Sequence, residues 1–115
     1  MPQYAHSLNK IVDSAINLKQ VRKSGLRFGD RVIINTQNSI YFLKMLSDGS
    51  NTVCGGWFDK QGLSPMKIGI RGCTWGGSMI KMDILAACGL CLEFGNRVVT
   101  SPIKKIFVFP DGSEN

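Results

Sequence analysis

Residues 31–46, RVIINTQNSIYFLKML, decide the fold expected of this chain. In residues 31–36, the side chains alternate in the pattern of a β-strand that packs one side against a hydrophobic core. Gln37-Asn38-Ser39 carries side chains that stabilise a tight reversal, and residues 40–46 are predicted to return as a second strand. Because this second strand is apolar on both sides apart from Lys44, we expect both of its faces to be at least partly covered.

Similar short runs continue to residue 109, and glycine-containing pairs separate them. The pairs are Asp48-Gly49, Gly55-Gly56, Gly76-Gly77 and Gly95-Asn96. Glycine within or between strands indicates sharp bends, which a small barrel needs. The sequence therefore predicts a mainly β fold, a small antiparallel barrel or rolled sheet of Sm-like or SH3-like type over residues 30–109. The expected strands include 52–58, with an interruption at Gly55-Gly56, and 79–85.

A helix is predicted ahead of this region, over residues 7–24. Its apolar residues recur at helical spacing, with Ser7 as the N-cap and Gly25 as the terminator. With 115 residues, 43% of them hydrophobic, the chain suits one domain spanning 1–115. Residues 110–115 are expected to form a flexible tail.

Positive charge is concentrated near the start of the chain. The whole sequence carries 14 Lys and Arg against 8 Asp and Glu, a net charge of +6. Residues 1–31 hold six of these basic residues against Asp13 and Asp30. Such a segment is either a solvated helix end or a surface that meets phosphate. The nucleic-acid-binding candidates are Lys19, Arg22, Lys23 and Arg27.

Residues 72–78 form a glycine-rich loop around a tryptophan. Backbone N–H groups of such a loop can converge on an anion, and the indole can stack on a base or a sugar. The loop matches no phosphate-binding motif. It is interpreted either as a tight connection in which the tryptophan caps the core, or as a small-molecule site. The ligand-binding candidates are Thr74, Trp75, Gly76, Gly77 and Ser78.

Catalytic groups are sparse. His6 is the one histidine, and it lies in a segment expected to be poorly supported. Asp83 and Glu93 fall in neighbouring predicted strands, where they are either a carboxylate pair or the polar outer side beside Lys81 and Arg97. We therefore predict no catalytic residues, and a protein that is not an enzyme.

Four cysteines leave a metal or redox site to be considered. Cys88-Gly89-Leu90-Cys91 is one C-x-x-C pair, and Cys54 and Cys73 are scattered singly. Structural zinc generally uses two such pairs, and buried free cysteine behaves as a small hydrophobic residue. We expect core thiols, with no metal site and no cofactor, while zinc binding by Cys88 and Cys91 stays open.

The chain lacks the apolar run of roughly 20 residues that a membrane helix needs, so no membrane contact is expected. Its first residues do not read as a secretory leader. Both features favour a cytoplasmic location.

Several short motifs resemble those of a group of small, uncharacterised bacterial β-domain proteins. They are Thr36-Gln37-Asn38-Ser39-Ile40-Tyr41, Gly55-Gly56, Gly76-Gly77-Ser78, Leu92-Glu93 and Val99-Thr100-Ser101-Pro102-Ile103, which follow the patterns T-x-N-S-x-Y, G-G, G-G-S and V-T-S-P-[VI]. The resemblance covers residues 29–108 and implies a compact β domain without a known activity. The recurring Asn, Thr and Ser residues are interpreted as turn-locking groups.

The function expected from the sequence is therefore a non-enzymatic binding or assembly module, present as a homo-oligomer that covers strand edges and an apolar rim. Two alternatives remain. One is a nucleic-acid-binding protein that uses the basic amino-terminal helix, and the other is a small-molecule or nucleotide-binding protein that uses the loop Gly72–Ser78.

Overall fold

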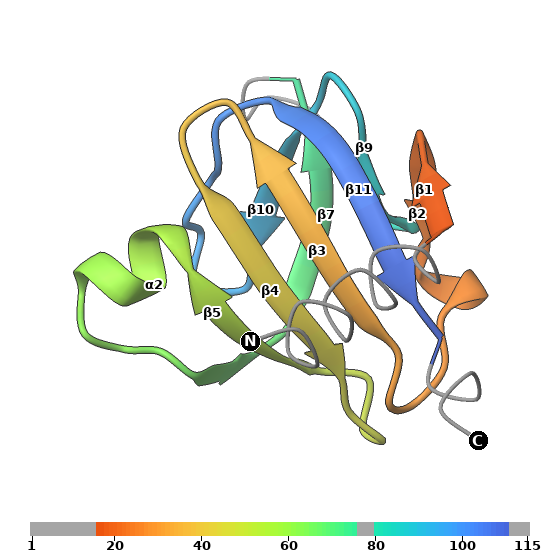
Figure 1. Cartoon of the computed structure of the whole chain (residues 1–115), viewed down its shortest axis with the longest axis horizontal. Helices are drawn as coiled ribbons and strands as arrows, with labels where there is room; N and C mark the ends of the chain where they lie inside the picture. Colours follow the sequence, from red (N-terminus) through yellow and green to blue (C-terminus); the bar gives the residue numbers. More distant parts are fainter. Residues whose placement is uncertain (1–15, 76–79, 111–115) are drawn as a thin grey trace, which may run out of the picture.

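The computed structural model describes residues 16–75 and 80–110, and their strands form three antiparallel sheets (Figure 1). The largest sheet has six strands in the order β1 (Ile16–Leu18), β11 (Ile103–Phe109), β3 (Arg31–Thr36), β4 (Ile40–Met45), β5 (Asn51–Gly55) and β6 (Met66–Ile68). A three-stranded sheet has the order β10 (Cys91–Phe94), β7 (Ile70–Thr74) and β8 (Ile80–Lys81). The third sheet pairs β2 (Gln20–Arg22) with β9 (Ile84–Ala87).

The core lies between two layers. In Figure 1, β7 and β10 lie behind β3 and β4, and the side chains between them are almost entirely buried. The largest of these are Phe58, Phe94, Ile34, Leu92, Ile103 and Ile106. The mainly β, antiparallel class is thus confirmed. The described strands do not close into the expected barrel, because the chain distributes them over three separate sheets.

The predicted hairpin of residues 31–46 is present as β3 and β4, and polar side chains fix its turn. The Thr36 hydroxyl donates to the Ser39 carbonyl over 2.9 Å and accepts from the Ser39 backbone N–H over 3.0 Å. Ser101, just before β11, donates its hydroxyl to Thr36 Oγ1 over 2.9 Å and accepts from the Asn38 backbone N–H. The motif residues therefore lock a turn, as the sequence indicated.

The expectation that both faces of the second strand are at least partly covered agrees with the structure, which gives β4 one buried face and one partly covered face. Alternate residues of β4 are buried, but Ile40 is 45% exposed, Phe42 is 48% exposed and Lys44 is exposed as well. The described second layer packs on the inner face of the six-stranded sheet, and the outward residues of β4 are the more exposed ones.

The predicted helix over residues 7–24 is also wrong where the structure describes it. Residues 7–15 lie outside the described residues. The following residues form β1, β2 and a single 3-10 turn, η1 (Lys23–Gly25). β1 pairs with β11 and β2 pairs with β9, so the segment connects two sheets. These long-range backbone hydrogen bonds outweigh the local helical spacing of the apolar residues.

The strand expected over residues 52–58 stops at Gly55, and α2 (Gly56–Lys60) follows it. Gly55 and Gly56 have φ angles of 98° and 46°, which turn the chain out of the sheet. The strand expected over 79–85 is likewise interrupted, since Met82 and Asp83 form the turn between β8 and β9. Residue 79 and the tail residues 111–115 lie outside the described residues.

Within the described segments, neither helix is of a length or hydrophobicity that could cross a bilayer.

Candidate functional site

The four basic candidates differ in exposure and in the hollows that they line. Lys19, Arg22 and Arg27 are exposed, whereas Lys23 is half-buried. Arg22 and Arg27 line one hollow of about 440 Å³, Lys23 and Arg27 line another of about 400 Å³, and Lys19 lines neither. Because residues 16–24 are strands and a turn, the shared helical surface that would have aligned these side chains is absent from that segment.

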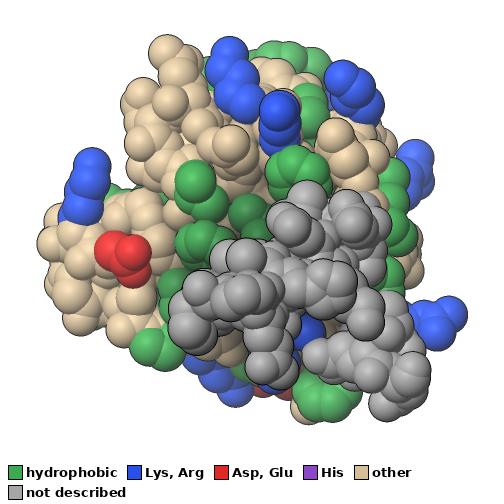
Figure 2. Space-filling model, in the orientation of Figure 1, with side chains coloured by type: hydrophobic (Ala, Val, Ile, Leu, Met, Phe, Trp, Pro, Cys, Tyr) green, Lys and Arg blue, Asp and Glu red, His purple; other side chains and the backbone are tan. Residues whose placement is uncertain are grey.

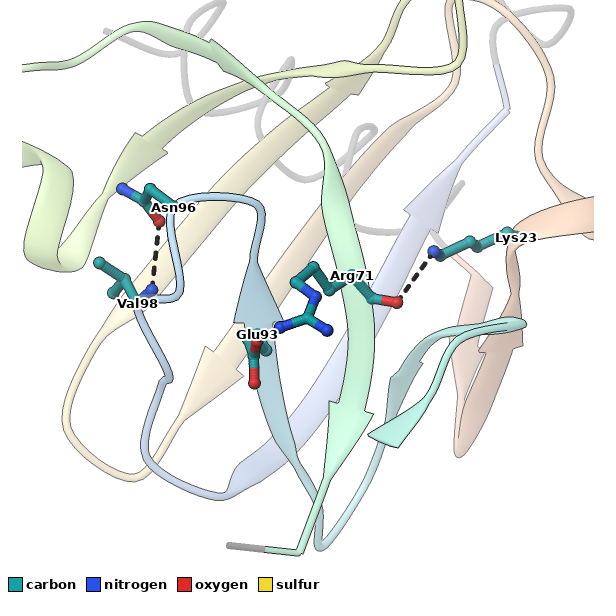
Figure 3. A network of polar contacts seen from close by, with 5 residues as sticks. All are labelled: Lys23, Arg71, Glu93, Asn96 and Val98. Carbon is teal, nitrogen blue, oxygen red and sulfur yellow. Dashed lines mark hydrogen bonds and ion pairs between the residues drawn. The ribbon is translucent and has the colours of Figure 1, made fainter. Parts of the chain in front are cut away.

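Lys23 is instead held against the three-stranded sheet (Figure 3). Its ammonium donates to the backbone carbonyl of Arg71 over 3.1 Å. Burial lowers the pKa of Lys23, and the nearby carboxylate of Asp83 partly offsets that effect. One N–H donor of the Lys23 ammonium is thus tied to the fold.

Glu93 forms an ion pair with Arg71, and Figure 3 shows the two side chains facing each other from β10 and β7. The separation is 2.5 Å, and Glu93 is only 8% exposed. Asp83 is exposed in the turn between β8 and β9. Glu93 is therefore neither half of the suggested carboxylate pair nor part of a polar outer side beside Lys81 and Arg97, because Arg71 neutralises it inside the protein.

The glycine-rich loop is described only in part. Gly76, Gly77 and Ser78 lie outside the described residues. Thr74 is fully buried at the end of β7, while Trp75 is 61% exposed, with the Lys81 ammonium 5.1 Å from its ring centroid. Trp75 therefore does not cap the core.

The strand register brings a different set of residues together on the outside of the six-stranded sheet. Phe107 of β11 lies opposite Ile33 of β3, Ile33 lies opposite Phe42 of β4, and Phe42 lies opposite Cys54 of β5. Directly paired residues of antiparallel strands point to the same side. These side chains form a continuous apolar row across four strands, of which Phe42 is the most exposed aromatic ring.

Basic side chains border this row. In the next row of pairs, Arg31 lies opposite Lys44, and Lys44 lies opposite Thr52, which faces Lys67 of β6. On the other side of the apolar row, Lys105 lies opposite Asn35. Where this face is visible in Figure 2, hydrophobic side chains lie near its centre, with lysines and arginines toward the rim. We call this surface the outer face, and we define it by the outward residues Asn17, Arg31, Ile33, Asn35, Ile40, Phe42, Lys44, Thr52, Cys54, Lys67, Lys105, Phe107 and Phe109.

The outer face is strongly asymmetric in charge. Its outward strand residues, within the described part of the chain, include four cations and not a single carboxylate. Lys67 is paired with Asp48 of the β4–β5 turn over 2.8 Å, so this ion pair adds little net charge, whereas Lys44 and Lys105 contribute to the positive field of the face. Such a surface attracts anionic partners and adds exposed rings on which planar groups can stack.

The cysteines are free thiols spread over the fold. Cys73 is buried, and Cys54, Cys88 and Cys91 are half-buried. Over residues 16–75 and 80–110, no three His, Cys, Asp or Glu side chains are grouped closely enough to hold a metal ion. Burial raises the pKa of the Cys73 thiol to about 11, which makes it a poor nucleophile at neutral pH.

No protein-family model, no curated protein and no solved structure matches the chain. The site is therefore argued from the geometry of its own residues.

Sequence reasoning missed the outer face, although a signal for it was present. In each of β3, β4 and β11, a basic residue stands two positions from an apolar one: Arg31 and Ile33, Lys44 and Phe42, Lys105 and Phe107. Residues two apart in a strand share a side. The pairing of β11 with β3 is what makes three separate patterns into one surface.

Proposed function

We propose that the chain is a non-enzymatic binding module that takes single-stranded nucleic acid across the outer face. The observation that carries this proposal is the in-register row of Phe107, Ile33 and Phe42, with cations in the rows on both sides of it. Exposed aromatic rings provide stacking platforms for bases of any identity, and flanking lysines and arginines meet the phosphates.

The spacing of the face suits this mode of binding. Neighbouring strands lie about 4.8 Å apart, and successive outward residues along one strand lie about 6.7 Å apart. A flexible single strand can place bases over the apolar row and phosphates over Lys44 or Lys105 within that span. A duplex hides its bases from a flat sheet face, since its grooves admit helices or narrow ribbons. The geometry therefore favours single strands.

Homo-oligomerisation through the same face is the second candidate, favoured by the exposed rings and aliphatic side chains of Phe42 and Ile40. A face-to-face pair of copies would bring the basic side chains of the two outer faces, Lys44 and Lys105 among them, against each other, which opposes association at low salt. An anionic partner is attracted by the same charges. For this reason we place nucleic acid first and self-association second.

The test is binding of a fluorescent oligothymidylate and a matched oligouridylate to the full chain, measured by anisotropy at several salt concentrations. Phe42→Ala removes the most exposed ring and is expected to weaken binding by about 1–3 kcal/mol, roughly 5- to 150-fold. Lys44→Gln combined with Lys105→Gln is expected to reduce the slope of log affinity against log salt by about 0.7 per lost phosphate contact.

The matched control is Lys19→Gln combined with Arg22→Gln, which removes the same charge from residues outside the outer face. We expect this control to bind nearly as the unchanged chain does. If the control loses affinity and the outer-face variants do not, the basic amino-terminal segment is the binding site and the outer face is not. Light scattering on the same samples reports any oligomer, and a dimer that Phe42→Ala dissociates without measurable oligonucleotide affinity would favour self-association.

Three predictions from the sequence remain predictions. They are a cytoplasmic location, small-molecule binding by the loop Gly72–Ser78, and similarity to Sm-like or SH3-like barrels.

A further inference from the structure

A pocket of about 400 Å³ lies between residues 23–28 and the turn that joins β4 to β5. Pockets of this volume are within the range that takes small organic ligands. Its wall combines an apolar part with a few polar groups, and it does not belong to the outer face. The lining residues that bear on its chemistry are Lys23, Arg27, Phe28, Met45, Asn51 and Leu85.

Asn51 is the unusual residue of this pocket. It occupies an inward position at the start of β5 and is only 2% exposed. Its partners in the sheet are Met45 and Ile68, and Met45 also lines the pocket. Its side-chain oxygen has no hydrogen-bond donor among the described residues. A buried amide oxygen without a hydrogen-bond donor destabilises the folded state. A bound molecule that donates an N–H or O–H to the Asn51 oxygen would explain why this acceptor is present.

Cationic groups and an aromatic ring complete the pocket. The Lys23 ammonium uses one of its three donors on the Arg71 carbonyl, so it can donate to a ligand as well. Arg27 and Phe28 are exposed at the entrance, and the Phe28 ring is 64% exposed. The carboxylate of Asp83 acts electrostatically on Lys23 from outside the pocket lining and reduces the positive field there.

We propose that this pocket binds a small organic anion with a flat ring, whose ring N–H or amino group donates to Asn51 and whose phosphate or carboxylate meets Lys23 and Arg27. The apolar side chains of Met45 and Leu85 contact the body of the ring, and Phe28 covers it from the entrance. The proposal is independent of nucleic-acid binding on the outer face, because no residue of the outer face lines the pocket.

The test is a thermal-shift and calorimetric titration of the full chain with four probes: adenosine 5′-monophosphate, adenosine, anthranilate and inorganic phosphate. Adenosine and inorganic phosphate each carry half of the required chemistry, so they are expected to bind at least tenfold more weakly than the monophosphate. Comparison of the monophosphate with anthranilate shows whether the anionic group is a phosphate or a carboxylate.

Two variants locate the binding. Asn51→Leu removes the acceptor at similar volume, and because that acceptor is unpaired, the unliganded variant should unfold at or above the temperature of the unchanged chain. Arg27→Gln changes an exposed side chain and leaves the core intact. Both are expected to lower probe affinity at least tenfold, whereas Lys19→Gln, which lies outside both this pocket and the outer face, should leave it unchanged.

The proposal fails if no probe stabilises the unchanged chain, or if Asn51→Leu and Arg27→Gln bind the probes as it does. It also fails if a crystal structure grown with the probe shows only a water molecule beside the Asn51 oxygen. If Asn51→Leu does not fold, two measurements replace it: the probe affinity of Arg27→Gln, and the shift of the Asn51 side-chain amide resonances when the probe is added. Amide resonances that do not shift overturn the proposal.

Discussion

At the scale of single residues, Cys73 shows how burial determines chemistry in this protein. The thiol is fully buried on β7, with its sulfur 3.6 Å from the backbone carbonyl of Leu85. Burial raises its pKa to about 11, from an ordinary value of 9.0. The fold therefore favours the protonated thiol, and this contribution to stability is present below about pH 9 and is lost as the pH rises toward 11.

We predict that iodoacetamide at pH 8 alkylates Cys54, Cys88 and Cys91 well before Cys73, as measured by peptide mass spectrometry over time. In denaturant, the four thiols should react at similar rates, which is the control. The stability difference between the unchanged chain and Cys73→Ala should also shrink as the pH is raised from 9 to 11. Alkylation of Cys73 at the rate of the half-buried thiols would contradict the buried environment described above.

At the scale of elements, α2 depends on a close contact between glycine and an aromatic ring. A Cβ atom on Gly56 would lie 2.3 Å from Cζ of Tyr41, and the Gly56 φ angle of 46° also disfavours a side chain. The Tyr41 ring cannot move aside easily, because it is buried and packs against Phe58 and Phe94. Its hydroxyl also accepts a hydrogen bond from the Trp57 backbone N–H over 3.3 Å.

Gly56→Ala is therefore expected to lower the free energy of unfolding by about 2–4 kcal/mol, through overpacking and backbone strain together. Urea denaturation measures the loss. Gly25→Ala is the matched control, since nothing lies within 4 Å of its added Cβ and its φ angle is not positive. The control should change stability by no more than about 1 kcal/mol. Equal urea midpoints for the two variants would show that α2 does not pack closely against Tyr41.

The same elements explain what the sequence could and could not predict. The hairpin β3–β4 was predictable, because its alternation and its turn chemistry are both local. Residues 16–24 were not, because their apolar spacing is compatible with either a helix or a strand. Pairing with β11 and β9 decides between them, and those partners come more than 60 residues later in the chain.

Gly55-Gly56 was recognised as a break, but the sequence did not show that α2 begins there. The outer face could likewise be predicted only in part from the sequence. The basic and apolar residues that share one side of a strand can be recognised in the sequence. Which strands lie next to each other in the sheet cannot. The sequence did not indicate that Asn51 is buried, because this residue follows a turn in which asparagine is common.

At the scale of the whole molecule, one aromatic cluster connects the layers. Tyr41 comes from the six-stranded sheet, Phe94 from the three-stranded sheet and Phe58 from α2, with ring centroids 4.8–6.3 Å apart. Phe58 and Phe94 are fully buried. Since each of these elements completes the same core, loss of one exposes the buried surface of the others, and the described elements should unfold together.

A single-tryptophan variant tests this cooperativity. Trp75 is mostly exposed, so Trp75→Phe leaves Trp57 as the fluorescent reporter, and its ring packs 5.2 Å from Phe58 in α2. In urea, we expect Trp57 fluorescence and far-ultraviolet circular dichroism to give the same midpoint and slope, because α2 and the sheets share one core. Adding Phe58→Ala should shift both signals together by about 3–5 kcal/mol. A fluorescence midpoint at lower urea than the dichroism midpoint would mean instead that α2 detaches first, and the two layers would then have to be held together without it.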